Sequence, residues 1–330
     1  MTYKDAGHDL DRSDAIVARL KERLPHIGGF GGVFPFPRGR WREPLFVAGT
    51  DSVGTKLLVA VQAKKHDTVG IDVVAMVVND IIVLGAKPLF FLDYIGAGVL
   101  DPGVIEDVVS GVIEGCRQAG CQLIGGETAE LSGMYAKGIY DLAGFGVGVV
   151  ERKAIVDGSK IRPGDVVIGL ESSGIHSNGY TLARAIFRRL GLTPGRRVAA
   201  LGATAGKALL EPTRIYVPAV LDLMKRFTVR GMANITGGGI PGNLNRTLPP
   251  SCDAEIDTAS WPRPAIFDFM QERGPVAEAE MFGAFNMGVG YTLVVPKDEA
   301  APVVRRCNRI GFPAHVIGKI ISGSGRVRLA

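Results

Sequence analysis

The stretch DTVGIDVVAMVVNDIIVLG, residues 67–85, determines the fold class. Apolar side chains surround this predicted helix on almost every face, which is typical of a helix buried in a protein core. Its polar exceptions include Asp72 and Asn79, seven residues apart and therefore on one face, with Asp80 beside them. A buried carboxylate is unfavourable unless it meets a cation, hydrogen-bond donors or a cleft. We expect this polar stripe to contact a metal or a ligand; satisfied core carboxylates are the alternative.

Strands and helices alternate outward from this helix, which predicts an α/β fold with mixed sheets. A charged segment with turn signals, residues 151–165, is the best boundary between two domains, 1–161 and 162–330. In the first domain we expect strands at 45–49, 89–94, 122–125 and 142–150 and helices at 13–24, 67–84 and 102–119. In the second we expect strands at 166–170, 289–295 and 315–321 and helices at 178–190, 213–227, 264–273 and 298–310.

The composition of the 330 residues excludes several classes of protein. With 46% hydrophobic and 22% charged residues the chain is globular, and its length suits two domains. The net charge of +5 comes from scattered basic residues without interleaved aromatics, so we expect no nucleic-acid partner. The charged first 24 residues lead us to expect no signal peptide, no apolar run reaches membrane length, and the four cysteines lack metal-binding spacing. We expect a cytoplasmic protein that does not bind membranes.

Two glycine-rich segments place acids at predicted strand ends, where α/β sheets collect ligands. GTDSVGTK, residues 49–56, carries Asp51 and Lys56, and GGETAE, residues 125–130, carries Glu127. Carboxylates on separate loops suit Mg²⁺, which takes oxygen ligands from a few carboxylates and from phosphates. Asp51 alone could instead cap an Asx-turn.

A second kind of site is predicted in the other domain. SSGIHSNG, residues 172–179, lies between a strand and a helix, where backbone N–H groups can bind a phosphate. His176 within it could donate to phosphate or exchange protons, or it could be a hydrogen-bonded turn histidine. TGGGI, residues 236–240, repeats the glycine-rich device at the start of a short helix. The N-terminal TYKDAGHD, residues 2–9, would by itself be a solvated tail.

Together with these motifs, GAKPLFFLDY, GCRQAGCQLIGGETAE, DLAGFGVGVVE, EPTRIYV and FNMGVG give the chain a resemblance over nearly its whole length. The chain resembles the phosphoribosylformylglycinamidine cyclo-ligase family, also called aminoimidazole ribonucleotide synthetases. The resemblance implies a ligase of purine biosynthesis that converts formylglycinamidine ribonucleotide and ATP, with Mg²⁺, to aminoimidazole ribonucleotide, ADP and phosphate through a phosphorylated amide. It also implies a homodimer in which two N-terminal domains share a β-barrel.

The resemblance assigns roles to residues that match the family motifs. It implies that Mg²⁺ is bound by Asp51, Asp80 and Glu127. Asp72 would lie next to these ligands without binding the metal itself. It implies that His176, Lys4 and Lys56 are catalytic, with His176 moving a proton during ring closure. The implied ATP and phosphate contacts are Lys4, Asp5, Gly49, Thr50, Asp51, Gly54, Thr55, Lys56 and Asn79. The implied substrate contacts are Ser173, Gly174, His176, Ser177, Asn178 and Gly179.

The chain departs from the family pattern at Ser52, Ser132, Asn234 and Gly242. The last two weaken any role for the loop around TGGGI, whereas the acids predicted to bind metal are unchanged. Two other functions stay open from the sequence. One is a different ATP-dependent enzyme of the same superfamily, and the other is a non-catalytic nucleotide-binding protein.

Overall fold

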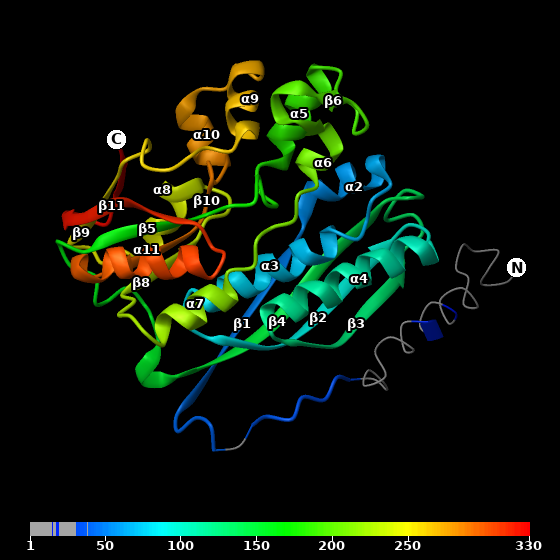
Figure 1. The fold of residues 1–330 in the computed structure, drawn as a ribbon. Helices are drawn as coiled ribbons and strands as arrows, with labels where there is room; N and C mark the ends of the chain where they lie inside the picture. The colour runs from blue at the N-terminus through cyan, green and yellow to red at the C-terminus, as the bar shows by residue number, and fades with distance from the viewer. Residues whose placement is uncertain (1–14, 16–17, 20–30, 38) are drawn as a thin grey trace, which may run out of the picture.

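The computed structural model describes residues 15, 18–19, 31–37 and 39–330. Lys4, Asp5 and most of the predicted helix 13–24 lie outside this part of the chain. The described residues form two mixed β-sheets with helices packed around them (Figure 1). This confirms the predicted α/β class. No helix among the described residues is long and apolar enough to cross a lipid bilayer.

The first sheet has the strand order β1-β4-β2-β3. β4 pairs antiparallel with both β1 and β2, whereas β2 and β3 are parallel. Helices α3 and α4 pack against one face of this sheet (Figure 1). Its strands are Pro44–Ser52 (β1), Lys87–Ala97 (β2), Gln122–Glu130 (β3) and Tyr140–Glu151 (β4). The helices between them are Gly54–Lys56 (η1), Leu57–Ala63 (α2), Val69–Ile82 (α3) and Pro102–Ala119 (α4).

Helix α4 matches its predicted boundaries because its end signals are local. The Asp101 carboxylate accepts hydrogen bonds from the N–H groups of Gly103 and Val104, and Pro102 occupies the first turn. Gly120 ends the helix in the left-handed conformation, with φ of 67°. These signals all lie within four residues of the helix ends, so sequence alone places them.

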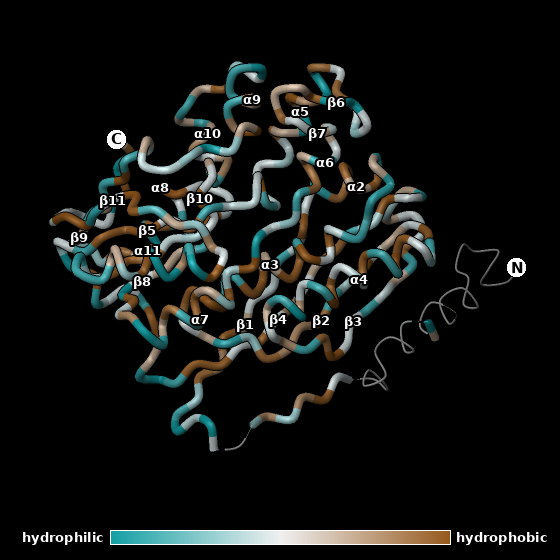
Figure 2. Tube along the Cα trace, viewed as in Figure 1, coloured by the Kyte–Doolittle hydropathy of each residue, from teal (hydrophilic) through white to brown (hydrophobic). Residues whose placement is uncertain are grey.

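Helix α3 is the buried centre of the molecule, as predicted. All of its residues except Ile71 and Asp80 are buried, and Figure 2 shows hydrophobic residues concentrated along it and the neighbouring strands. Glycines let α4 approach closely: a Cβ on Gly70 would lie 2.2 Å from the carbonyl oxygen of Val108. A Cβ on Gly111 would lie 2.2 Å from the carbonyl oxygen of Asp67. Helix α3 also contacts α7 and β8, so it connects the two sheets.

The second sheet has the order β12-β9-β11-β5-β10-β8, antiparallel except for the β12–β9 pair. Its longer strands, Val166–Glu171 (β5), Val289–Val295 (β10) and Ala314–Ser322 (β11), confirm three predicted strands. Gly231–Asn234 (β8), Cys252–Ile256 (β9) and Val327–Leu329 (β12) were not expected from the sequence. They are short and pair only with distant segments, so they carry little local signal. Arg197–Val198 (β6) and Ala203–Thr204 (β7) form a small hairpin.

Helices surround this second sheet (Figure 1). The predicted helices are present with shorter bounds, as Tyr180–Arg189 (α5), Val217–Met224 (α7), Ala265–Arg273 (α9) and Ala300–Arg309 (α11). Two further helices, Ala205–Leu209 (α6) and Glu278–Ala284 (α10), were not predicted. The short helix expected after TGGGI is present as Gly239–Leu244 (α8), with Pro241 in its first turn. The remaining 3₁₀ turns are Arg152–Ala154 (η2), Ala199–Leu201 (η3), Asn245–Thr247 (η4) and Lys297–Glu299 (η5).

Two predicted strand ends are wrong by several residues. Strand β1 continues to Ser52 and strand β3 continues to Glu130. Asp51 and Glu127 therefore lie within strands and not in turns beyond them. A glycine that suggested a turn instead lets neighbouring strands pack closely, since a Cβ on Gly126 would lie 2.2 Å from Oδ1 of Asp93, its partner on β2.

Candidate active site

Asp51 of β1 and Asp80 of α3 lie close enough for their charges to interact. Asp51 is half-buried on the face of the sheet that α3 covers, and Asp80 is the exposed residue of α3. Burial raises the pKa of each carboxyl, and the charge of Asp51 raises the pKa of Asp80 further. Two carboxylates that repel one another are stabilised by a bound cation, so this pair fits a divalent metal such as Mg²⁺.

Asn234 holds the Asp80 carboxylate in place. Its side-chain nitrogen donates a hydrogen bond of 2.8 Å to Oδ1 of Asp80 and lowers the pKa that burial raises. Both side chains line a cavity of about 270 Å³ that also includes Arg246 and Asp157. The charge of Arg246 lowers the pKa of Asp80 too. The departure from the family pattern at Asn234 argued against a role for this segment, but the structure makes Asn234 part of the site. The hydrogen bond joins residues that are 154 positions apart in the sequence.

Glu127 does not join Asp51 and Asp80 within this chain. Across the sheet, Asp51 is paired with Gly144, and Gly144 is paired with Asp93. Asp93 is in turn paired with Gly126. Glu127 follows Gly126 and therefore points to the opposite face of the sheet. It is also three strand spacings from Asp51, or about 14 Å. Among the described residues no group of three His, Cys, Asp or Glu side chains could hold a metal ion.

Lys56 is fully buried and joins the two halves of the chain. Its ammonium lies 2.8 Å from Oδ2 of Asp72 and donates hydrogen bonds to Oδ1 of Asp72 and to the carbonyls of His176 and Glu211, at 2.9, 2.9 and 2.7 Å. Thr213 also donates to Asp72 from its backbone N–H and its hydroxyl. Every donor of the ammonium is occupied, so this geometry does not support the predicted phosphate contact of Lys56. Oδ1 of Asp72 accepts three hydrogen bonds, and its Oδ2 faces the Lys56 ammonium without a hydrogen bond, so Asp72 fits the alternative of a core carboxylate left open above.

Asn79 has a similar structural role. It is fully buried, donates to the carbonyl of Arg214 at 2.9 Å and accepts from the N–H of Tyr216 at 2.9 Å. These bonds fix the segment EPTRIY against α3. The side chain is therefore used within the protein, and the geometry does not support the predicted ATP contact.

His176 lies in the turn before α5 and is 2% exposed. Its Nε2 accepts a hydrogen bond of 3.2 Å from the N–H of Ser173, and its φ of 67° is left-handed. Burial, helped by the charges of Lys56 and Arg214, lowers its pKa to about 3. A neutral, buried ring is a poor proton carrier at neutral pH, so the structure favours the turn-histidine alternative.

The remaining residues of the predicted ATP site differ in their exposure to solvent. Gly54 and Thr55 are exposed beside Asp51, whereas Gly49 packs toward Val77 and Ile81 of α3. Thr50 is exposed on the uncovered face of the sheet and donates to the carbonyl of Gly144 at 2.9 Å.

In the turn at 172–179 the hydroxyls are used within the protein. Ser173 donates to the carbonyl of Pro212, and Ser177 shares a hydrogen bond with Thr213. Gly174 is buried and Gly179 packs against Phe285. Asn178 is half-buried, and its side-chain nitrogen lies 3.8 Å from Sδ of Met76. A Cβ on Gly237 would lie 3.6 Å from the Asn178 oxygen, so TGGGI lies beside this residue.

Comparison with known proteins agrees with both halves of the fold. Residues 41–150 match the N-terminal domain of AIR synthase related proteins, and residues 162–329 match their C-terminal domain. A phosphoribosylformylglycinamidine cyclo-ligase of Sorangium cellulosum is 53% identical over 98% of this chain and 96% of its own length. One of Syntrophotalea carbinolica is 51% identical over 97% of this chain and 94% of its own length. The chain belongs to the AIR synthase related family and, within it, to the phosphoribosylformylglycinamidine cyclo-ligases.

Solved structures share the fold at lower identity. Thiamine-monophosphate kinase from Stenotrophomonas maltophilia superposes with a TM-score of 0.64 at 18% identity, covering 96% of this chain and 94% of that one. Hydrogenase maturation protein HypE in complex with ATP superposes with a TM-score of 0.69 at 18% identity, covering 98% and 92%. At these identities the likeness concerns the fold alone.

Proposed function

We propose that the chain closes the imidazole ring of aminoimidazole ribonucleotide in purine biosynthesis, using formylglycinamidine ribonucleotide and ATP and releasing ADP and phosphate. The observation that carries this proposal is a sequence identity of 50% or more to cyclo-ligases over nearly the entire chain. The Asp51–Asp80 pair supplies what ATP chemistry requires, a place for a divalent cation. The ATP complex of HypE, which has the same fold, also supports nucleotide binding.

The chemistry needs an activated amide. An amide oxygen is a poor leaving group until ATP phosphorylates it, after which the neighbouring nitrogen attacks the carbon, closes the ring and expels phosphate. Phosphoryl transfer depends mainly on positioning and on neutralising charge. Asp51 and Asp80 would hold Mg²⁺, which would neutralise phosphate charge. Exposed backbone at Gly54 and Thr55 lies next to them and is placed to meet the nucleotide.

Buried residues position this site without touching the reactants. Lys56 and Asp72 tie α3 to the turn that contains His176, and Asn79 ties α3 to Tyr216. These contacts fix the distance between the acids on the first half and Asn178 on the second. We therefore assign Lys56, Asn79 and His176 as positioning residues and Asn178 as a substrate contact.

We further propose that the protein is a homodimer joined through the uncovered face of the first sheet. Phe46 and Phe145 are 63% and 42% exposed on that face, on the paired strands β1 and β4, where Phe145 lies opposite Thr50, four residues along β1 from Phe46. Exposed apolar side chains on a sheet are a typical protein interface. Light scattering should give the mass of a dimer for the wild type and of a monomer for Phe46→Asp with Phe145→Asp. A dimeric double variant would refute this interface.

The reaction is tested with purified protein, formylglycinamidine ribonucleotide and Mg-ATP, following ADP release and aminoimidazole formation. Asp80→Asn should lose at least about 100-fold in kcat, because metal-ion stabilisation of a phosphoryl transfer contributes several kcal/mol. Asp107→Asn is the matched control, since Asp107 is an exposed carboxylate on α4. Absence of product from folded wild-type protein would refute the reaction. Equal activity in Asp80→Asn would refute Asp80 as a metal ligand.

A further inference from the structure

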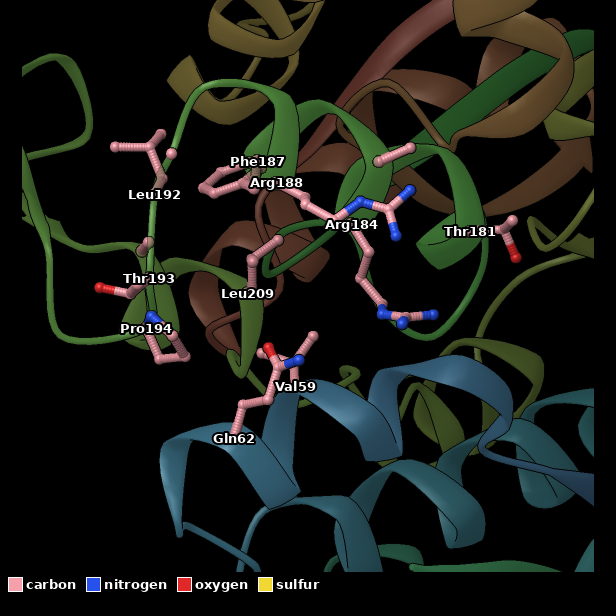
Figure 3. A pocket seen from close by; sticks show the side chains of 13 residues that line it. Val59, Gln62, Thr181, Arg184, Phe187, Arg188, Leu192, Thr193, Pro194 and Leu209 are labelled. Atoms are coloured by element: carbon pink, nitrogen blue, oxygen red, sulfur yellow. The ribbon is translucent and has the colours of Figure 1, made fainter.

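A large cavity lies outside the Asp51–Asp80 pair, between α2 of the first half and α5 of the second. Its volume is about 770 Å³, within the range of small-molecule sites. Its walls include the apolar side chains of Val59, Phe187, Leu192 and Leu209 (Figure 3). A space of this size and lining is suited to an organic molecule rather than to a single ion.

Two arginines give this cavity a strong positive charge. Arg184 and Arg188 are one turn apart on α5, and Figure 3 shows both side chains extending from that helix beside the space above α2. No residue that lines the cavity is acidic. Within the described residues neither guanidinium makes an ion pair or a hydrogen bond, and Arg184 is half-buried. Like charges four residues apart on a helix repel one another, and a bound anion would relieve that repulsion.

The position of the cavity connects it to the predicted substrate turn. Helix α5 begins at Tyr180, two residues after Asn178, and its next exposed residue, Thr181, lines the cavity. Arg184 follows one turn further along the helix. At 1.5 Å per residue the rise along α5 from Tyr180 to Arg184 is about 6 Å, so Arg184 lies one helical turn from the turn that contains Asn178. A substrate held at Asn178 can therefore extend toward both arginines.

We propose that this cavity binds the ribose 5-phosphate end of the substrate and that Arg184 and Arg188 bind its phosphate. This inference rests on the proposed function, which requires two phosphorylated reactants. The triphosphate belongs with the carboxylate pair and its metal, so the phosphate of the second reactant needs a separate cationic site. Guanidinium groups bind phosphate through paired, charge-assisted hydrogen bonds, and the apolar wall suits the carbon face of the sugar.

The test compares the substrate and ATP dependence of five proteins: the wild type, three single variants and one double variant. Arg184→Gln and Arg188→Gln should each raise the KM for formylglycinamidine ribonucleotide about 10-fold, which corresponds to 1.4 kcal/mol. The KM for ATP should change less than about twofold. Arg189→Gln is the matched control, because Arg189 lies on the same helix but outside the cavity and donates to the carbonyl of Arg273. A double variant with the wild-type KM for the substrate would overturn the proposal.

A binding measurement separates this proposal from the proposed function. Ribose 5-phosphate is titrated by calorimetry into the wild type and the Arg184→Gln, Arg188→Gln double variant, without ATP. Binding by the wild type that the double variant loses supports the cavity site, whether or not the protein forms aminoimidazole. Equal binding by both proteins overturns the site, even if the wild type is an active cyclo-ligase.

Discussion

Replacing Lys56 with methionine removes an ammonium group that is fully buried and bonded to Asp72 and to two backbone carbonyls. Methionine fills similar space but donates no hydrogen bond. The Asp72 carboxylate then keeps only its bonds from Thr213 and stays as an uncompensated buried charge. Removing one partner of a buried ion pair lowers the free energy of unfolding by about 3 to 5 kcal/mol. We expect Lys56→Met to lose that much stability.

Urea unfolding followed by circular dichroism measures this loss. With an m-value of about 3 kcal/mol/M, the midpoint should fall by about 1 to 1.7 M. Lys225→Met is the matched control, because Lys225 is exposed, and its midpoint should not move. Adding Asp72→Asn to Lys56→Met removes the unpaired charge, so the double variant should be more stable than the sum of the single losses predicts.

The same variants distinguish a structural lysine from a catalytic one. The KM for ATP, measured on folded Lys56→Met at low temperature, should stay within about twofold of the wild type, because an ammonium that is fully occupied contacts no phosphate. A stability loss below about 1 kcal/mol, together with a KM for ATP raised 10-fold or more, would refute the reasoning. Lys56 would then contact phosphate, as the sequence first suggested.

Three further predictions concern other parts of the fold. Asn234→Ala frees the Asp80 carboxylate and should weaken the apparent Mg²⁺ affinity about 10-fold in activity titrations; an unchanged Mg²⁺ dependence would contradict the role of Asn234. The pKa of His176 is about 3 in the folded protein and ordinarily 6.5. Between these two pH values the unfolded chain binds a proton at His176 that the folded chain does not bind. The free energy of unfolding should therefore fall by about 2 kcal/mol from pH 7 to pH 5. His176→Asn, which tolerates the left-handed backbone, should reduce that pH dependence in urea midpoints, and an identical dependence would count against it. Gly70→Ala places a Cβ 2.2 Å from a backbone oxygen of α4 and should lower the unfolding free energy by about 3 kcal/mol; Gly242→Ala has open space and should not, and equal midpoints for the two variants would show that the helices adjust freely.

Local signals carried much of the fold. The apolar pattern of residues 67–84 predicted α3, and the pattern of residues 102–119 predicted α4 with both of its ends, which the structure shows to be capped by Asp101 and Gly120. The order of motifs along the chain also predicted the family, which the comparisons confirm. These features depend on neighbouring residues or on the sequence itself, so no tertiary contact is needed to read them.

The roles of the site residues depended on distant partners. Lys56 is typical of a phosphate-binding lysine until the carbonyls of His176 and Glu211, 120 and 155 residues away, are seen to occupy its donors. Glycine-rich turns predicted at strand ends proved to be strand, because pairing across the sheet extends β3 through Glu127 and turns that carboxylate to the far face.

The sequence by itself therefore determined the α/β class, the family and most of the longer helices, whereas α6 and α10 were missed. Only the tertiary structure placed Asp51 near Asp80 and gave the Asp80 carboxylate a hydrogen bond from Asn234. Only the tertiary structure also placed Arg184 and Arg188 in the wall of one cavity, without a partner among the described residues. The physical reason is that helix periodicity and capping act within one or two turns, whereas burial and pairing of a charge are set by segments that meet only when the two halves pack together.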